Sequence, residues 1–345
     1  MKRLTTIFLM LCFFSAGATS WRLNNNPAVN ADFTTFQAAH DAASAGDTIY
    51  VEGTGDQTHY GTLTITKKLV IIGPGYFLME NDSTYANPVY ARLLNMIIEP
   101  QAAGTEVYGL FFKAADGSGN YHLQIKASNV IIARNYFHNL SYDRIKLSAN
   151  IDNVTINQNY IQSLIETLTN SVVANNIIIS NNYIEDRISL NNLSNGILTN
   201  NVIRHGFVNV YNSQIKNNIL YATGLSDAFC VYNSGNYIAY NLVSYNLVSG
   251  GNYGPGNIGN VDMSTVFVGY PTQGSYSADG RWQLKAGSPA IDAGEGGIDC
   301  GMFGGPLPYV LSGLPAIPRI YEAIVPTAGS TTSGLPVIIK AKSQN

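Results

Sequence analysis

The stretch NVTINQNYI at residues 153–161 is followed by NIIISNNYI at residues 176–184. Each stretch contains an Asn, an aliphatic residue three positions later, a second Asn three positions after that, and an apolar residue two positions further on. The pattern occurs six times between residues 129 and 243, with Gly235 in place of the first Asn in the last copy. Its second Asn falls at Asn135, Asn159, Asn182, Asn201, Asn218 and Asn241. A repeat with intervals of 17 to 24 residues indicates stacked coils, which form a solenoid.

Two columns of apolar residues emerge when the repeats are aligned on the second Asn. The first column contains Ile132, Ile156, Ile179, Leu198, Ile215 and Ile238, and the second contains Phe137, Ile161, Ile184, Ile203, Leu220 and Val243. The runs around them are short, rich in β-branched residues and bounded by Asn, Ser or Gly, which favours strands over helices. Strands of successive coils would pair in parallel about 4.8 Å apart, with both columns facing inward and the Asn amides bonded along the stack.

The sequence also predicts what lies at the two ends of the solenoid. Asp32 is a good N-cap and apolar residues follow at helical spacing, so residues 33–45 are predicted to form a short amphipathic helix over the first coil. Pro residues become frequent from residue 306, and two possible strands follow them. We expect one solenoid domain over residues 21–305, then a Pro-rich segment and a C-terminal tail over residues 306–345.

Two segments near the ends of this domain resemble known proteins. AGDTIYV at residues 45–51 resembles the opening of bacterial β-helix repeat proteins, and GSPAIDAG at residues 287–294 resembles their closing segment. Over residues 30–305 the chain resembles the right-handed parallel β-helix proteins, the superfamily that includes pectate lyases and polygalacturonases. The resemblance implies an all-β, right-handed parallel β-helix of the secreted bacterial type, and it transfers no catalytic role.

One tripeptide, Arg144-Ile145-Lys146, also matches the polygalacturonases. In that family a His-containing segment and paired aspartates precede the basic tripeptide, whereas here the tripeptide comes first and no Asp-Asp pair occurs. The polygalacturonase site is therefore not carried over. Ile145 is predicted to point inward, with Arg144 and Lys146 on the outward side of the same strand.

Residues 1–20 are typical of a secretory signal peptide. They begin with Lys2 and Arg3, continue as an apolar run to Phe14, and end in small residues. No later segment is apolar and long enough to span a bilayer. We therefore expect the chain to be exported, and then to be secreted or held at the cell surface or envelope.

The charge of the chain bears on its partners. The formal net charge is −3, only 12% of residues are charged, and Lys and Arg are scattered along the sequence. This distribution argues against nucleic acid or an anionic membrane as a partner. The residues also predict no metal site and no cofactor.

The most promising polar group lies on two neighbouring coils. Counting from the second Asn of the repeat, the third and fourth positions are Glu185 and Asp186 on one coil and Arg204 and His205 on the next. Adjacent rungs would bring these four side chains within about 5 Å of one another. A carboxylate beside Arg and His can serve acid or base catalysis, and the same arrangement is also typical of a surface salt-bridge cluster. The four are the candidate catalytic residues, and both interpretations stand.

A column of aromatic residues provides the candidate carbohydrate-binding surface. Tyr136, Tyr160 and Tyr183 follow the second Asn on three consecutive coils, which predicts a stack of rings on the outward side. Arg187, beside the polar group, and His138, two rungs away, are the other two candidate carbohydrate-binding residues. Sugar rings pack well on aromatic faces, but identical residues also stack simply to stabilise a solenoid.

Three functions follow from these residues. The first is non-catalytic binding or scaffolding of polysaccharide, because the coils are poor in paired carboxylates. The second is a polysaccharide lyase or glycoside hydrolase acting on uronic-acid-containing glycans; hydrolysis needs two carboxyl groups roughly 5 to 9 Å apart across the bond, and Glu185 and Asp186 are adjacent in sequence. The third is a structural envelope component that neither binds nor cleaves glycans.

Overall fold

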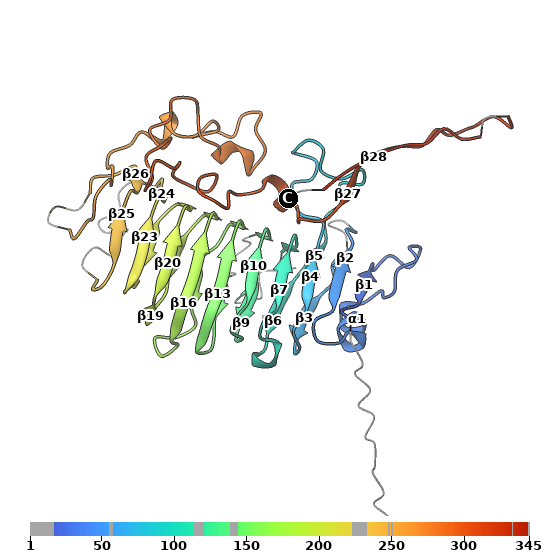
Figure 1. The fold of residues 1–345 in the computed structure, drawn as a ribbon, viewed down its shortest axis with the longest axis horizontal. Coiled ribbons are helices and arrows are strands. Elements are labelled where there is room, and N and C mark those ends of the chain that lie inside the picture. The colour runs from blue at the N-terminus through green and yellow to red at the C-terminus, as the bar shows by residue number, and fades with distance from the viewer. Residues whose placement is uncertain are drawn as a thin grey trace, which may run out of the picture.

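The computed structural model describes residues 17–54, 58–113, 121–138, 144–222, 233–247, 249, 251–332 and 334–343. It shows an all-β parallel β-helix in which the coils contribute strands to three sheets (Figure 1). The predicted fold class is therefore confirmed. Most of the predicted signal peptide, residues 1–16, lies outside the described residues.

Sheet A is the largest of the three, with 11 strands among the described residues, and it faces the viewer in Figure 1. Its coil strands pair in parallel, and each repeat position lies beside the same position of the next coil. Its strands are β1 (Ser20–Leu23), β2 (Thr48–Val51), β4 (Val70–Ile72), β7 (Glu106–Tyr108), β10 (Ile131–Ala133), β13 (Ile151–Asn157), β16 (Ala174–Ser180), β19 (Leu193–Ser194), β20 (Gly196–Thr199), β23 (Ser213–Lys216) and β25 (Tyr237–Ala239).

Sheets C and B complete each coil, with eight and seven strands in the described part of the chain. Sheet C follows sheet A after a tight turn and contains β5 (Arg92–Leu93), β8 (Phe111–Phe112), β11 (Tyr136–Phe137), β14 (Tyr160–Ile161), β17 (Tyr183–Ile184), β21 (Val202–Ile203), β24 (Ile219–Leu220) and β26 (Leu242–Val243). Sheet B contains β3 (Thr62–Ile65), β6 (Asn95–Ile98), β9 (Leu123–Ile125), β12 (Ile145–Leu147), β15 (Ile165–Thr167), β18 (Arg187–Ser189) and β22 (Gly206–Val208).

The two predicted apolar columns form the core of the coils. Every member of both columns is at most 1% exposed. Ile156, for example, lies between Ile132 and Ile179 in the register of sheet A. Equivalent apolar residues of successive coils therefore pack on one another along the solenoid axis. These contacts between coils stabilise an array in which a single coil alone would be unstable.

The second Asn of each repeat forms a buried ladder at the turn between sheets A and C. Asn182 is fully buried, and its amide nitrogen donates to Ser180 O at 3.0 Å and to Asn201 Oδ1 at 3.0 Å. Its oxygen accepts from the backbone nitrogen of Asn159 at 2.9 Å. The same bonds recur from Asn135 to Asn241, so the ladder satisfies turn amides that the strands leave without partners.

The residue before each ladder Asn adopts the left-handed backbone conformation. These residues are Arg134, Gln158, Asn181, Asn200, Asn217 and Tyr240, with φ between 55° and 58°. Asn is frequent in this column because it tolerates positive φ better than most residues. The turn thereby points these side chains outward, along the edge between sheets A and C.

The strands of the coils are followed by a long segment without regular strands. The last coil strand is β26, and residues 251–318, here called the return segment, run back along the outer face of sheet C (Figure 1). This segment has no strand repeat and contains three single 3-10 turns, η2 (Met263–Thr265), η3 (Gly280–Trp282) and η4 (Leu311–Gly313); the fourth 3-10 turn, η1 (Pro100–Ala102), lies within the coils. Asn257 adds one more rung to the Asn ladder and Ile258 pairs in parallel with Leu242, so only the chain after residue 258 packs on the solenoid without extending it.

The left-handed turn residues anchor the return segment to one coil after another. Asn217 Oδ1 accepts from Glu295 N, and Asn200 Nδ2 donates to Asp299 O. The remaining anchors are Asn181 Nδ2 to Gly304 O at 2.7 Å, Gln158 Nε2 to Pro308 O at 2.6 Å, and Arg134 Nη1 to Leu314 O at 2.8 Å. A single column of side chains thus fixes the return segment across five coils.

The N-terminal cap is shorter than predicted. Helix α1 (Phe36–Ala42) lies at the first coil and buries Phe36, Ala39 and His40. Its N-cap is Thr35, whose side chain accepts from Ala38 N, while Asp32 accepts from the backbone of Arg22 and so takes no part in capping. The predicted position of the helix is correct and its limits of 33–45 are too wide.

Asp47 ties the cap to the first strand, and we expect its replacement to change the acid sensitivity of the fold. Its carboxylate accepts from Thr19 N at 2.8 Å, Trp21 Nε1 at 2.9 Å and Ser44 N at 2.9 Å. Burial raises the pKa of Asp47, but these hydrogen bonds to the charged form outweigh burial and leave the pKa below its usual value.

A pKa that is lower in the folded than in the unfolded protein gives stability that is fully present above the usual value of about 4 and is lost as the pH falls through the folded value. Asp47→Asn should therefore lower the free energy of unfolding at neutral pH and reduce its loss on acidification. Urea unfolding at about pH 7 and about pH 3 checks this. An equal loss on acidification in both proteins would exclude Asp47 as an acid-sensitive contact.

The predicted tail strands form an antiparallel hairpin, β27 (Arg319–Ile324) and β28 (Ile338–Lys342), which projects away from the coils (Figure 1). Many of its apolar side chains, including Ile320 and Ile339, are exposed. Within the described ranges, no helix is both long and apolar enough to cross a membrane.

Candidate ligand-binding cleft

The predicted tyrosine column points outward from sheet C, but it is covered. Tyr136, Tyr160 and Tyr183 lie side by side in the register of the sheet and are only 9%, 5% and 2% exposed. The rings of Tyr160 and Tyr183 stack with centroids 4.4 Å apart, and the return segment packs over them. The column is therefore no open platform, because its rings form a second core between sheet C and the return segment.

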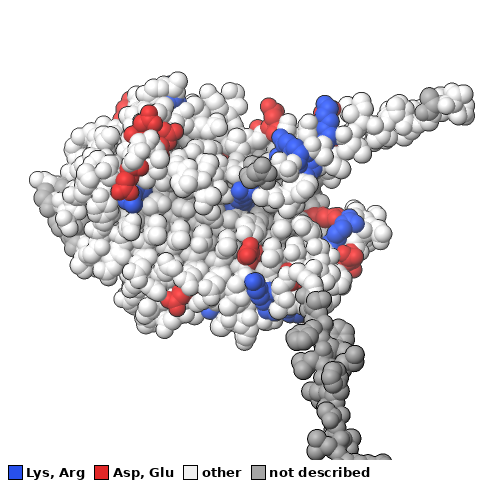
Figure 2. All heavy atoms as spheres, viewed as in Figure 1, with Lys and Arg blue, Asp and Glu red and all other residues white. Residues whose placement is uncertain are grey.

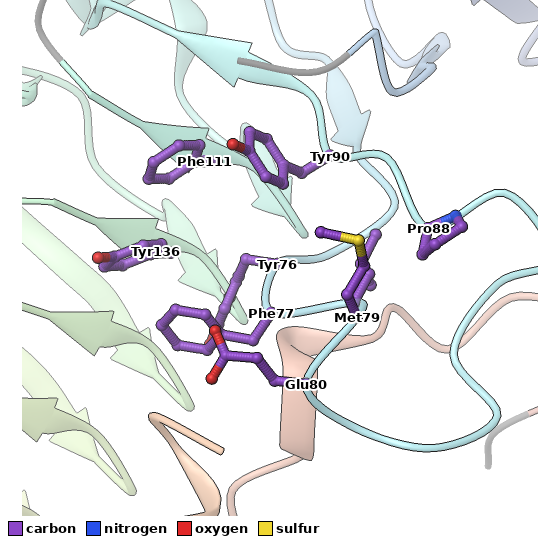
Figure 3. Close-up of a pocket in the computed structure, with 9 residues that line it drawn as sticks. Tyr76, Phe77, Met79, Glu80, Pro88, Tyr90, Phe111 and Tyr136 are labelled. Carbon is purple, nitrogen blue, oxygen red and sulfur yellow. The ribbon is translucent and has the colours of Figure 1, made fainter. Parts of the chain in front are cut away.

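Tyr136 lies at one end of this second core, beside an apolar pocket of about 220 Å³ (Figure 3). The loop over residues 76–90 encloses the pocket from the other side. The labelled lining residues are Tyr76, Phe77, Met79, Glu80, Pro88, Tyr90, Phe111 and Tyr136. His138 does not line this pocket; its Nδ1 lies 2.8 Å from the Tyr136 hydroxyl and 2.6 Å from Gln162 Oε1.

A more polar cleft of about 440 Å³ opens at the other end of the second core, and we call it the Glu185 cleft. Its lining residues are Tyr183, Glu185, Arg204, His205, Tyr221, Ala222, Tyr270, Pro271, Arg281 and Trp282. Three of the four predicted catalytic residues therefore line one cavity. The fourth, Asp186, does not.

The repeat explains why these side chains converge. Glu185 follows β17, Arg204 follows β21 and Tyr221 follows β24, so all three leave sheet C at the same position of successive coils. Their backbone nitrogens continue the parallel ladder, with Glu185 N bonded to Ile161 O and Arg204 N bonded to Ile184 O. At Glu185 and Asp186 the chain bends between β17 and β18, and so adjacent residues are not held on opposite faces of one strand.

Glu185 is the centre of the polar contacts in the cleft. Its carboxylate accepts from the hydroxyl of Tyr183, from the hydroxyl of Tyr221 at 3.3 Å, and from Arg204 Nη1 at 3.1 Å. Burial raises the pKa of Glu185 above its usual value, although Arg204 opposes the shift. Burial and the nearby Glu185 charge also raise the pKa of Tyr221, so its hydroxyl remains protonated.

Asp186 does not line the cleft, and its carboxylate contacts the side chains of His205 and Arg187. Its Oδ1 lies 3.1 Å from His205 Nδ1 and 3.2 Å from Arg187 Nε. The side chains of all three are about one third to one half exposed. Arg187 therefore belongs to this surface cluster, and His205 links the cluster to the cleft.

The return segment supplies the opposite wall of the cleft, which the repeat pattern did not predict. The Trp282 ring stacks on Tyr183 with centroids 4.7 Å apart and lies 4.8 Å from the Tyr221 ring. The Arg281 guanidinium carbon lies 4.9 Å from the centre of the Trp282 ring, and Arg281 Nε donates to Gly269 O at 3.0 Å. The only sequence signal was that Trp282 is one of just two Trp residues in the chain.

Sheet B carries a separate polar cluster. Ile145 is fully buried, as predicted, and Arg144 Nη1 lies 2.8 Å from Glu166 Oε1. Lys146 Nζ lies 4.0 Å from the same oxygen, and its side chain is only 11% exposed. Glu166 was not among the predicted site residues, and here it neutralises the two cations.

No protein-family model matches the chain, and no curated protein matches it. Among the described residues, no three His, Cys, Asp or Glu side chains gather closely enough to hold a metal ion. The Glu185 cleft therefore offers aromatic surface, two guanidinium groups, an imidazole and one carboxylate as its chemistry.

Proposed function

We propose that this protein is an exported or surface-held β-helix that binds polysaccharide in the Glu185 cleft without cleaving it. The observation that carries the proposal is the combination of aromatic and charged groups on the cleft walls. Tyr221, Tyr270 and Trp282 offer ring surface for the CH groups of a sugar, and Arg204 and Arg281 offer donors for its hydroxyl and carboxylate oxygens. The predicted signal peptide supports export.

The set of carboxyl groups favours binding over hydrolysis. Of the cleft-lining residues, all within the described part of the chain, Glu185 alone carries a carboxyl group. Hydrolysis with inversion or retention uses two such groups on either side of the bond. The nearest sequence partner, Asp186, does not line the cleft and is bonded to His205 and Arg187.

One observation supports an enzymatic alternative. Burial raises the pKa of Glu185, so a larger fraction of this carboxyl is protonated near neutral pH than in a solvated glutamate. A protonated carboxyl beside Arg204 is a reasonable general acid for a lyase or hydrolase acting on uronic-acid-containing glycans. A purely structural envelope role, the third candidate, would require neither binding nor turnover.

We expect Arg204→Ala to weaken retention on polysaccharide by roughly tenfold, because a hydrogen bond from a charged donor is lost. Arg187→Ala is the matched control, since Arg187 has nearly the same side-chain exposure (47% against 48%) and lies outside the cleft. Co-sedimentation with a panel of insoluble plant, algal and host polysaccharides measures binding.

The same incubations measure cleavage through new reducing ends and unsaturated uronates. New ends that disappear in Glu185→Gln would establish the enzymatic alternative in place of the proposal. If Arg204→Ala and Arg187→Ala reduced retention on polysaccharide equally, the cleft would be excluded as the binding site. If the protein neither bound nor cleaved any polysaccharide, the structural envelope role would be the remaining candidate.

A further inference from the structure

A long groove runs along the outer face of sheet A, on a different side of the coils from the Glu185 cleft. Two cavities of about 360 and 550 Å³ share Ile72 and Ile317, so they are neighbouring compartments of one groove. Outward-pointing residues of β2, β4, β7, β10 and β13 line its floor, and the Pro-rich end of the return segment lines its wall.

The charged groups at this groove already have partners. Glu52 is paired with Arg22 at 2.7 Å, and Arg134 donates to Gln158 and to the return segment. Glu106 accepts from the Tyr108 hydroxyl at 2.7 Å. Figure 2 shows that charged atoms are sparse over this face of the molecule. The groove therefore favours a neutral ligand over an ionic one.

Two tyrosines on the groove floor have a regular spacing. Tyr50 lies beside Ile72 in the parallel register, and Ile72 lies beside Tyr108, so the two rings are on the same side of the sheet and two strands apart. Strands in a sheet are separated by about 4.8 Å, which places Tyr50 and Tyr108 roughly 10 Å apart along the solenoid axis.

This spacing matches a particular kind of polymer. In an extended chain of β-linked sugars, successive rings are rotated by about half a turn, so every second ring presents the same face. The length of that two-sugar repeat is close to the separation of Tyr50 and Tyr108. A helical, α-linked chain of the same sugars has no such straight repeat and would not follow the row of strands.

We propose that the sheet A groove binds one extended chain of neutral β-linked sugars, with alternate rings packed on Tyr50 and Tyr108. This inference rests on the proposed function for its ligand class, polysaccharide, and assigns it a second surface. Ile72 lies between the two tyrosines and provides apolar floor for the intervening sugar.

Binding of two hexasaccharides tests the inference. Cellohexaose and maltohexaose contain the same sugar in extended β-linked and curled α-linked form, and both are titrated calorimetrically into the purified protein. We expect cellohexaose to bind at least tenfold more tightly than maltohexaose. Tyr50→Ala and Tyr108→Ala should each weaken cellohexaose binding by roughly tenfold, because each removes one stacking ring.

Three further variants make the result specific. Tyr237→Ala removes an exposed tyrosine from β25 of the same sheet, outside the groove, and should leave binding unchanged. Tyr108→Phe keeps the ring and loses only the bond to Glu106, so it should bind as the unaltered protein does and show that the ring matters. Arg204→Ala distinguishes the two surfaces, because cellohexaose bound in the sheet A groove keeps its affinity in this variant and cellohexaose bound in the Glu185 cleft loses it.

Each contrary result is informative. Equal binding of the two hexasaccharides, or binding of neither, would overturn the groove proposal. Cellohexaose binding that is lost in Arg204→Ala and retained in both tyrosine-to-alanine variants would overturn the groove and support the cleft. If cellohexaose binding is lost in the two tyrosine-to-alanine variants and unchanged in Arg204→Ala, the groove proposal is supported. This holds whether or not co-sedimentation supports polysaccharide binding in the cleft.

Discussion

Replacing Asn182 with alanine should lower the free energy of unfolding by about 3 to 5 kcal/mol. The side chain is fully buried, and its nitrogen donates to Ile156 O, Ser180 O and Asn201 Oδ1 at 2.9 to 3.0 Å. Its oxygen accepts from the backbone of Asn159. Alanine has the right backbone conformation for this site but leaves donors and acceptors on three coils without partners in a dry interior.

The control for this substitution is Asn175→Ala in the same strand, β16. Asn175 also belongs to a row of stacked polar side chains, since its Nδ2 donates to the Asp152 carboxylate at 2.9 Å and its Oδ1 accepts from Asn195 Nδ2 at 2.8 Å. These bonds are exposed to water, so their loss should cost less than about 1 kcal/mol. Urea unfolding compares the two variants, and equal losses would show that burial of the ladder adds nothing to its strength.

Asp279→Ala should loosen the return segment and destabilise the fold by about 2 to 4 kcal/mol. The Asp279 carboxylate is fully buried and accepts from Asn81 Nδ2 at 3.0 Å, Tyr309 Oη at 3.2 Å and Ser312 N at 2.6 Å. It thereby joins the loop over residues 76–90 to two distant parts of the return segment. Without it, the buried Ser312 N loses its acceptor, and Asn81 and Tyr309 each lose one bond while keeping those to Ser312 Oγ and Tyr76 Oη.

Limited proteolysis measures this loosening directly. Cleavage within residues 251–318 should be faster in Asp279→Ala, because a segment held by few contacts opens more often than the coils do. Asp262→Ala is the control: this carboxylate caps a 3-10 turn of the same segment through Ser264 N and is exposed. If both variants were cleaved at the rate of the unaltered protein, the Asp279 contacts would not be what holds the return segment in place.

The parts of the fold that repeat could be predicted, and the part that does not repeat could not. The inward columns around Ile156 and Ile161 and the ladder at Asn159 follow from periodicity, because each coil places the same residue at the same point. The return segment has no period, so its course along sheet C was not visible in the sequence. The column before the ladder, which includes Gln158 and Asn181, did repeat, but its role as an anchor depends on a partner about 120 to 150 residues away.

The same distinction applies to the candidate site. Glu185, Arg204 and His205 were found because they occupy equivalent positions on adjacent coils. Arg281 and Trp282 were missed because the return segment brings them to the cleft. The tyrosine column was predicted in the correct place, but its exposure was not, since burial of Tyr160 depends on the same segment.

The anchoring of the return segment has a consequence for how the molecule comes apart. In a simple solenoid each coil touches only its neighbours, and the terminal coils fray independently of the middle. Here one continuous segment is bonded to five successive turns, from Asn217 to Arg134, and so it acts as a splint along the stack. Local unfolding of one coil would have to break hydrogen bonds to this shared segment. The coils therefore unfold as a single cooperative unit, and folding is complete only when the return segment has docked on them.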